Sequence, residues 1–383
     1  MKILLVTHFD EQIAKLSYII DRLKKDNEVI VFADHKLKKA DKSWKYMTAK
    51  RIDTHLYYWR MTDQSKYYKT RLFGSYPLWL KFLFWIGFFK FSFWEKLVQK
   101  ILNEDKPDPL IIEDLKTLKP DLVIGSPLTV WEGHLDIEFV KAAKFAGIPT
   151  AAIIMTWDNC VNKTRLYPIP DIVFAWNEYH KRDLIVYHRV PEDKIVLMGA
   201  YMFEKWMYPP KPTPYAEFCQ KWGLNSEKPI VTYIGSTKSI TGQKHEDLRQ
   251  SIREVRDGLD PNIQLIVRPH PNNCDSLDDW EMPGVWIIPR KTISAAAGGF
   301  DLAYNTYFHS EYVTSINSSA VIEAMIIGKE VRLIYKEKYK EKQIDTLHFR
   351  YLFPDKDIKK FLNFGPESSA EIVAKTIKKL LTH

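Results

Sequence analysis

Short apolar runs alternate with longer amphipathic segments along the chain, and this alternation limits the possible folds more than any other feature. In the first half the predicted strands are 3–6, 28–32, 122–125, 150–155, 172–176 and 195–199, and the predicted helices are 11–25, 136–146 and 178–188. Strands that alternate with helices of this length predict a parallel sheet with helices on both faces. The first half is therefore expected to form an α/β, Rossmann-like domain.

A proline-rich segment divides this pattern into two blocks. Pro209, Pro210, Pro212 and Pro214 lie in an irregular, polar segment at 206–228, which is typical of an interdomain linker. After it, predicted strands recur at 230–234, 264–267, 285–288, 312–316 and 331–334, with predicted helices at 246–258 and 320–327. The chain of 383 residues also exceeds the size at which one core usually keeps growing.

We therefore expect two Rossmann-like, doubly wound domains that face each other across a cleft. The first is expected at 1–205, the linker at 206–228 and the second at 229–365. The segment 366–383 is predicted to contain a helix that can cross back to the first domain. Because ligands bind at the carboxyl ends of the strands in open parallel sheets, candidate functional residues are expected where predicted strands end.

Charge and cysteine content limit the partners and the compartment. The formal net charge of +8 favours an anionic partner, such as nucleic acid, nucleotide phosphates or anionic lipid. Cys160, Cys219 and Cys274 are too far apart for a zinc site or a disulfide framework, which predicts a reduced, cytoplasmic setting. The apolar run at 3–6 is too short for a secretory signal and is interpreted as the first strand.

An aromatic stretch at 73–94 predicts contact with a membrane surface. Its aromatic residues include Trp79, Phe82, Phe84, Trp85, Phe88, Phe89, Phe91 and Phe93, and Lys81 and Lys90 lie between them. Crossing a bilayer needs about 20 predominantly apolar residues, so this stretch is too short. Aromatic rings and lysines suit the headgroup boundary, and we expect an interfacial anchor. The alternative is a core helix beside a solvated basic face at 36–51.

The strand predicted at 264–267 ends in Arg268-Pro269-His270-Pro271. Two prolines stop the hydrogen-bonding ladder and fix the backbone around His270. Because this is the ligand end of a parallel strand, we interpret Arg268 and His270 as contacts for phosphate oxygens. The alternative is a purely structural turn, which would need neither side chain.

The strand predicted at 312–316 ends in Asn317-Ser318-Ser319, directly before a predicted helix. Backbone amides at a helix start, together with two hydroxyls, predict an anion site. An ordinary serine N-cap is the alternative, but it accounts for only one of the two serines. Glu323 lies four residues after Ser319 on the same helix face, where it can accept hydrogen bonds from ribose hydroxyls.

Other strand ends supply further candidates. Gly235 and Ser236 follow the strand at 230–234, and the glycine would let the backbone approach a ligand closely. In the first domain, Asp158 follows the strand at 150–155 and is a candidate general base for an acceptor hydroxyl. An Asx turn that closes the strand is the alternative. The other candidates for this base are Glu132, His134, His8 and Asp10.

Two of these motifs resemble those of known families. The His270-Pro271 pair and the Ser318-Ser319 helix start resemble the HP and SS motifs of GT-B bacterial sialyltransferases, Kdo transferases and CDP-glycerol glycerophosphotransferases, where they hold the phosphate of the donor nucleotide. The segment 196–200 is similar to the end of the first domain in the glycerophosphotransferases and in non-hydrolysing UDP-N-acetylglucosamine 2-epimerases. The acidic motif of the sialyltransferases is not evident, so their base is not carried over.

A closer resemblance is to uncharacterised bacterial surface-polysaccharide glycosyltransferases, over roughly residues 120–352. It is carried by the motifs 157–159, 176–178 with Lys181-Arg182, 317–324 and 343–349. The resemblance implies that Thr346 and His348 lie by the donor. A polar loop is the alternative interpretation of that last motif.

The resemblance implies a metal-independent GT-B glycosyltransferase, with an acceptor-binding first domain and a donor-binding second domain. It would move a sugar from a nucleotide sugar to a hydroxyl of a lipid-linked or growing surface glycan, such as lipopolysaccharide or capsule. No cofactor is expected, because the nucleotide sugar is a substrate. With the anchor at 73–94, the expected location is cytoplasmic and peripheral, on the inner face of the plasma membrane.

Other functions fit parts of the same sequence pattern. A CDP-glycerol-type glycerophosphotransferase or a UDP-N-acetylglucosamine 2-epimerase-like enzyme would use the same fold. Nucleic-acid binding would use the basic segment, but the chain lacks the signatures of the common modules, so no nucleic-acid partner is expected. Asp355-Lys356-Asp357 has the spacing of a metal-binding DxD motif, but it precedes a lysine-rich segment and is interpreted as a helix cap.

Overall fold

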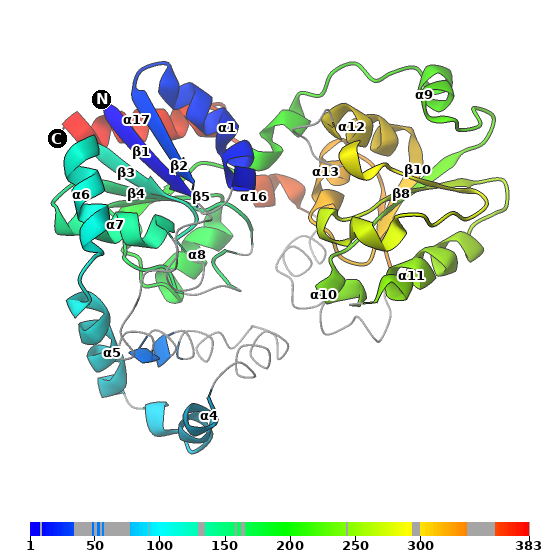
Figure 1. The fold of residues 1–383 in the computed structure, drawn as a ribbon. Helices are drawn as coiled ribbons and strands as arrows, with labels where there is room; N and C mark the ends of the chain where they lie inside the picture. The colour runs from blue at the N-terminus through cyan, green and yellow to red at the C-terminus, as the bar shows by residue number, and fades with distance from the viewer. Residues whose placement is uncertain are drawn as a thin grey trace. The chain divides into compact units, whose positions relative to one another are not determined.

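The computed structural model of the chain describes residues 1–7, 10–33, 48–49, 52–53, 56, 77–90, 92–128, 135–157, 159–161, 165–242, 244–292, 299–334 and 357–382. The chain divides into two compact units (Figure 1). Unit 1 comprises Met1–Met202 and Tyr351–His383, and unit 2 comprises Phe203–Arg350. Each unit is built around a sheet of its own.

Unit 1 contains a six-stranded sheet in the order β2-β1-β3-β4-β5-β6. The strands are β1 (Lys2–Thr7), β2 (Glu28–Ala33), β3 (Leu122–Gly125), β4 (Thr150–Ile153), β5 (Ile172–Ala175) and β6 (Ile195–Leu197). Every pairing is parallel. The chain first adds a strand on one side of β1 and then continues on the other side from β3, so the strand order reverses between β1 and β3. This reversal is the point where open α/β sheets bind ligands.

The helices of unit 1 are α1 (Asp10–Lys24), α4 (Leu78–Trp85), α5 (Ser92–Glu104), α6 (Pro109–Leu118), α7 (Leu135–Phe145), α8 (Glu178–Val186), α16 (Ile358–Leu362) and α17 (Ser369–Thr382), with 3₁₀ turns η1 (Phe88–Lys90) and η2 (Glu192–Lys194). They lie between these strands in the sequence, except α16 and α17, which follow the last strand of unit 2. The start of α6 shows why the sequence folds this way. Asp108 caps it by accepting a 2.9 Å hydrogen bond from Leu110 N, and Pro109 occupies the first turn, where no donor is needed.

The C-terminal segment packs on unit 1. Helix α17 lies beside α1 (Figure 1), and Arg22 Nε of α1 donates to Glu371 Oε1 of α17 at 2.5 Å. Asn177, which caps α8, also donates from Nδ2 to Phe361 O of α16 at 2.6 Å. Asp357 caps α16 by accepting from Lys360 N at 3.0 Å, which confirms the interpretation of this aspartate as a helix cap.

Unit 2 contains a five-stranded parallel sheet in the order β11-β10-β7-β8-β9. Its strands are β7 (Ile230–Ile234), β8 (Gln264–Arg268), β9 (Val285–Ile287), β10 (Ser310–Ser315) and β11 (Val331–Leu333). Counted within the unit, this is the 3-2-1-4-5 order of a Rossmann sheet. Its strand order reverses between β7 and β10.

Helices cover both faces of this second sheet. They are α9 (Tyr215–Trp222), α10 (Lys238–Thr241), α11 (His245–Asp257), α12 (Gly299–His309) and α13 (Ala320–Ile326), with 3₁₀ turns η3 (Tyr201–Met207), η4 (Pro271–Leu277) and η5 (Arg290–Thr292). Ile230 and Ile266 pack with Leu302 of α12, whereas Val231 and Leu265 pack with residues of α11 on the opposite face. Apolar side chains therefore point to both faces of the strands, as in a doubly wound sheet.

Three helices of unit 2, the four-residue α10 together with α9 and α12, were not predicted from the sequence. Helix α9 lies inside the predicted linker and contributes Phe218 and Cys219 to the core. Helix α12 was not predicted, because residues 302–307 of this helix are all buried and leave no regular polar face. The predicted strands of both sheets are confirmed, with boundary shifts of one or two residues at most ends.

Candidate functional site

Three neighbouring parallel strands of unit 2 end at the same position along the sheet. Strand β7 lies between β10 and β8, and its last residue, Ile234, is in register with Ser315 of β10 and Arg268 of β8. The segments that follow these strands contain Gly235 and Ser236, Pro269 and His270, and Asn317 to Ser319. Neighbouring strands are about 4.8 Å apart, so the flanking strand ends are separated by about 10 Å. We call these three segments the strand-end cluster.

Ser236 joins the strand-end cluster through hydrogen bonds in two directions. Its Oγ accepts from Asn317 N at 2.9 Å, across the point where the strand order reverses. Its carbonyl oxygen accepts from Asn273 Nδ2 of η4 at 3.1 Å, and Asn273 also donates to Thr241 Oγ1 at 3.0 Å. Ser236 and Asn273 are almost fully buried. These bonds fix the three segments relative to one another.

Gly235 allows β7 and β8 to approach closely at this edge. Gly235 N donates to Arg268 O at 2.8 Å. A Cβ atom at residue 235 would lie 3.1 Å from His270 N and from Pro269 Cα, both of which are backbone atoms. The absence of a side chain at this position therefore sets the place of His270.

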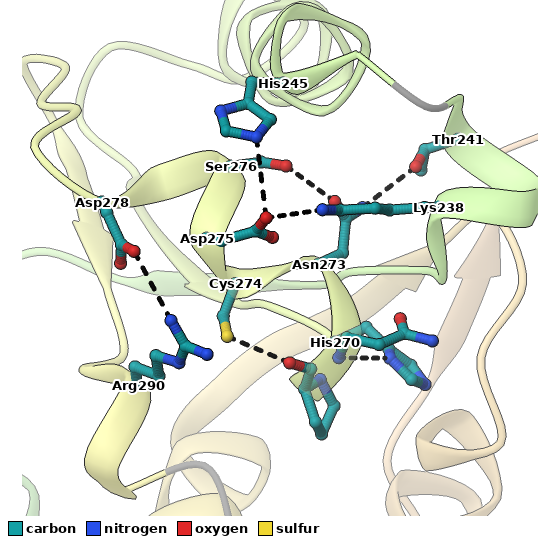
Figure 2. Close-up of polar contacts among 12 residues, drawn as sticks. Lys238, Thr241, His245, His270, Asn273, Cys274, Asp275, Ser276, Asp278 and Arg290 are labelled. Atoms are coloured by element: carbon teal, nitrogen blue, oxygen red, sulfur yellow. Dashed lines mark hydrogen bonds and ion pairs between the residues drawn. The ribbon is translucent and has the colours of Figure 1, made fainter.

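The imidazole ring of His270 is held by a backbone hydrogen bond at the start of η4. Its Nδ1 accepts a 3.2 Å hydrogen bond from Asn272 N (Figure 2). In the neutral ring the proton therefore lies on Nε2, which makes Nε2 a hydrogen-bond donor. A donor held by the backbone at the end of a parallel strand suits an anionic ligand.

Ser318 and Ser319 precede α13 in different ways. Ser318 is 8% exposed, and its Oγ accepts from Ala320 N at 3.3 Å, which leaves the hydroxyl hydrogen to donate. Ser319 is the N-cap residue by position, but it does not cap the helix through its side chain. Helix α13 has only seven residues, so hydroxyl and backbone donors, rather than a long helix dipole, characterise this end.

Arg268 and Glu323 form an ion pair beside the strand-end cluster. Arg268 Nη1 lies 2.9 Å from Glu323 Oε2 and also donates to the hydroxyl of Tyr307. Burial alone would lower the pKa of Arg268, but Tyr307 and Glu323 outweigh it and raise that pKa. Burial also raises the pKa of Tyr307. The carboxylate of Glu323 is thus already engaged within unit 2, and the pair links β8 to α13.

A second polar group was not predicted from the sequence. Lys238, at the start of α10, donates from Nζ to Asp275 Oδ2 of η4 at 2.5 Å, and His245 Nε2 lies 3.6 Å from the same oxygen (Figure 2). The hydrogen bond from Lys238 lowers the pKa of Asp275. In the sequence, Lys238 could have been found as a charged residue two positions after the candidate Ser236. Nothing in the sequence indicated a role for Asn273, which lies three positions after His270.

The candidate bases lie largely outside the described residues. The candidate bases that lie outside the described residues are Glu132, His134, Asp158 and His8. The predicted donor-binding residues Thr346 and His348 also lie outside the described residues. In the sequence, His8 follows β1, and Glu132 and His134 follow β3, which are the two strands at the reversal of the unit 1 sheet. Asp158 follows β4 instead. The turn after β4 is closed by Asn159, whose Oδ1 accepts from Met155 N at 3.1 Å and from Thr156 N at 2.7 Å.

The described residues contain no group of three or more His, Cys, Asp or Glu side chains that could hold a metal ion. The three cysteines are buried and unbridged.

Comparison with known proteins identifies the fold. No family model matches the chain, and no curated protein matches it. The S. aureus protein MnaA in complex with UDP superposes with a TM-score of 0.56 at 12% identity, covering 100% of this chain and 97% of that one. The UDP-GlcNAc 2-epimerase from Methanocaldococcus jannaschii gives 0.53 at 14% identity, covering 99% of this chain and 100% of that one.

A third similar structure is the UDP-GlcNAc 2-epimerase from Neisseria meningitidis bound to UDP-GlcNAc. Its TM-score is 0.50 at 18% identity, and the match covers all of both chains. Identities this low show the fold alone. The predicted fold class, α/β with two Rossmann-like parallel sheets of the GT-B kind, is confirmed.

Proposed function

We propose that the protein is a glycosyltransferase that moves a sugar from a nucleotide-sugar donor to a hydroxyl of a lipid-linked or growing surface glycan. The observation that carries this proposal is the strand-end cluster of unit 2. His270 and Ser318 lie at the same edge of the sheet, on either side of β7, and Ser236 and Asn273 bind their segments together. The cluster lies where a Rossmann sheet binds nucleotides.

In this proposal the strand-end cluster binds the diphosphate of the donor. Transfer breaks the bond between the anomeric carbon and the terminal phosphate oxygen, and forms a bond from that carbon to the acceptor oxygen. The nucleotide leaves with the bonding electrons, so negative charge grows on the phosphate. Donors fixed before the reaction stabilise such charge without reorganisation, and His270 Nε2 and the Ser318 hydroxyl are proposed to do so.

The other groups have supporting roles in the proposal. The acceptor hydroxyl would lose its proton to a general base, for which Asp158, Glu132 and His134 stay the candidates from the sequence. The Arg268–Glu323 ion pair would hold the start of α13, and Glu323 would present its remaining oxygen to a ribose hydroxyl. No metal is required in this scheme, and activity should therefore survive EDTA.

Nucleotide binding tests the proposal. Thermal shift across UDP, CMP, CDP, GDP and dTDP should find at least one nucleotide that stabilises the protein. His270→Ala and Ser318→Ala should each weaken its binding by about tenfold to a hundredfold, because each removes a hydrogen bond to a charged group. Ser226→Ala, at the opposite end of β7, is the matched control and should bind as wild type does. Full-strength binding by both site variants would refute the proposal.

A second function is favoured by the structural comparisons. The S. aureus and N. meningitidis structures contain UDP and UDP-GlcNAc, and the latter protein is a 2-epimerase. An epimerase of this kind would convert UDP-GlcNAc without any acceptor. Product analysis after incubation with UDP-GlcNAc alone separates the two functions: a new nucleotide sugar supports epimerisation, whereas turnover that depends on an added glycan acceptor supports transfer.

We also propose that the enzyme works at the inner face of the plasma membrane, where a lipid-linked acceptor would be found. The exposed aromatic side chains of α4 and α5 favour this location.

A further inference from the structure

We infer that the outward faces of α4 and α5 form a docking surface for an anionic lipid bilayer. The exposed apolar side chains of this region are Leu78, Trp79, Phe82, Trp85 and Ile86 in and directly after α4, and Phe93 and Leu97 of α5. We call this set the aromatic face. The inference does not depend on the proposed activity, because the aromatic face lies in unit 1 and the strand-end cluster lies in unit 2.

The exposed side of α4 is apolar along its whole length. Phe82 is 57% exposed and Trp85 is 79% exposed, and the residues of this side recur at intervals of three or four positions. Leu80 and Phe84 on the other side are buried. Helix α4 therefore has apolar side chains on its solvent side as well as its buried side, with Lys81 as its one charged residue, a pattern that water-facing helices of globular proteins avoid.

Helix α5 exposes apolar side chains next to lysines, and it buries Val98 and Leu102 together with the charged side chain of Glu95. Phe93 and Leu97 are exposed, one turn apart, while Glu95 on the inward side is 8% exposed. Glu95 Oε1 lies 2.5 Å from Arg189 Nη1 and 3.8 Å from Arg165 Nη1. The exposed aromatic and aliphatic side chains of α5 therefore exceed what an ordinary amphipathic surface helix presents to water.

Buried polar contacts attach α5 to the rest of unit 1. Gln99 Nε2 of α5 donates to Asp53 Oδ1 at 2.9 Å, and Asp53 Oδ2 lies 3.3 Å from Arg165 Nε. Further along, Tyr167 donates from its hydroxyl to Leu102 O at 2.5 Å. These contacts hold the inward side, so the aromatic face is presented outward on a fixed support.

The charge around the aromatic face selects an anionic partner. From residue 77 to residue 100 the sequence contains four lysines and one acid, Glu95, whose side chain is buried against arginines. Lys96 and Lys100 are exposed on the same side of α5 as Phe93 and Leu97. Glu104 lies one turn further on, 3.8 Å from Lys100. Lysine stems and aromatic rings together match the boundary between headgroups and acyl chains.

The aromatic face is suited to binding the surface of a bilayer and not to crossing it. No helix within the described ranges is long and apolar enough to cross a membrane. Apolar side chains that enter the headgroup region, combined with lysines near anionic lipid, give reversible binding that depends on salt and lipid charge.

Vesicle flotation with the full chain tests the inference. Vesicles of phosphatidylcholine mixed with phosphatidylglycerol should bind the protein, and vesicles of phosphatidylcholine alone should bind much less. Phe82→Ser combined with Trp85→Ser should lower partitioning into the mixed vesicles by about tenfold or more, because two large apolar groups are removed. Lys96→Glu combined with Lys100→Glu should lower it by a similar factor and abolish the preference for anionic lipid.

The matched control variants change exposed residues of unit 1 outside the aromatic face. Leu110 of α6 and Phe145 of α7 are 70% and 66% exposed, so Leu110→Ser with Phe145→Ser makes an equivalent loss of apolar surface. Lys15→Glu with Lys24→Glu on α1 makes the same charge change away from the aromatic face. Both controls should float as wild type does. Melting temperatures identify any variant that fails to fold. If the Phe82→Ser, Trp85→Ser variant does not fold, the Lys96→Glu, Lys100→Glu variant and its α1 control decide the test.

Three results would overturn the inference. They are absence of flotation at low salt, equal flotation of the aromatic-face and control variants, and self-association in solution that Phe82→Ser with Trp85→Ser abolishes while vesicle binding persists. The last would assign the face to a second copy of the chain. Nucleotide binding is measured separately in the absence of vesicles, so failure here is distinguishable from failure of the proposed activity.

Discussion

At the scale of single residues, the site combines groups that the sequence identifies with groups that only the fold identifies. His270 and Ser318 follow predicted strands, and sequence reasoning therefore places them at one sheet edge. Asn273 binds Ser236 across two segments, and Lys238 pairs with Asp275 of η4. Those pairings depend on how 3₁₀ and helical turns fold back over the strand ends, which residue spacing alone does not determine.

Gly235→Ala tests the close approach of β7 and β8. The added methyl group would meet backbone atoms of Pro269 and His270 at 3.1 Å, so the strand end must shift. We expect a loss of about 1–3 kcal/mol in stability, as for overpacked sites, and weaker nucleotide binding. Thermal unfolding and isothermal titration measure the two effects. Gly258→Ala, at the end of α11, has ordinary contact distances of 3.5 Å or more and should be neutral. Equal behaviour of both variants would contradict the role of Gly235.

Asp136 gives unit 1 a specific pH dependence. It is fully buried, its Oδ2 accepts from Leu128 N at 2.8 Å, and burial raises its pKa from 3.8 to about 7. As pH rises above about 4, the unfolded chain loses this proton first, so the free energy of unfolding falls until the folded carboxyl is also ionised. Between pH 6 and pH 8 the fall should be about 1 kcal/mol.

Asp136→Asn should remove this pH dependence and stabilise the protein at pH 8, because the amide oxygen can still accept from Leu128 N. Urea unfolding at pH 6 and pH 8 measures the change. Asp114→Asn, at an exposed position of α6, should retain the wild-type slope. An unchanged slope in Asp136→Asn would show that another group titrates.

At the scale of elements, the parallel strands were predictable and several helices were not. Alternation of strand and helix gave all five strands of unit 2, because each strand is a short apolar run bounded by polar turns. Helices α9 and α12 were missed since proline masked the first and complete burial removed the polar face of the second. Helix α5 was not predicted either, because its exposed side combines Phe93 and Leu97 with lysines and its buried side includes Glu95.

The buried ion pairs behind α5 can be tested by mutation. Arg165 is 7% exposed and lies between Asp53 and Glu95, so Arg165→Met would leave two buried carboxylates without this partner. We expect a loss of about 3–5 kcal/mol of stability. Arg290→Met breaks an exposed pair with Asp278 and should cost less than about 1 kcal/mol. Urea unfolding compares the two, and a small effect of Arg165→Met would show that the ion pairs do not fix α5.

At the scale of the whole molecule, two parallel sheets of the GT-B kind supply two strand reversals where ligands can bind. In unit 2 the reversal between β7 and β10 coincides with the bond from Asn317 N to Ser236 Oγ. In unit 1 the reversal lies between β1 and β3, which precede His8 and the pair Glu132 and His134 in the sequence. The fold is shared with UDP-GlcNAc 2-epimerases, and a shared fold does not by itself determine a reaction.

The most direct measurement is a crystal structure of the protein with the nucleotide diphosphate that gives the largest thermal shift. We expect phosphate oxygens at hydrogen-bond distance, about 2.7–3.2 Å, from both His270 Nε2 and Ser318 Oγ. A nucleotide bound elsewhere on the molecule, or phosphates that reach only one of these two side chains, would contradict this expectation.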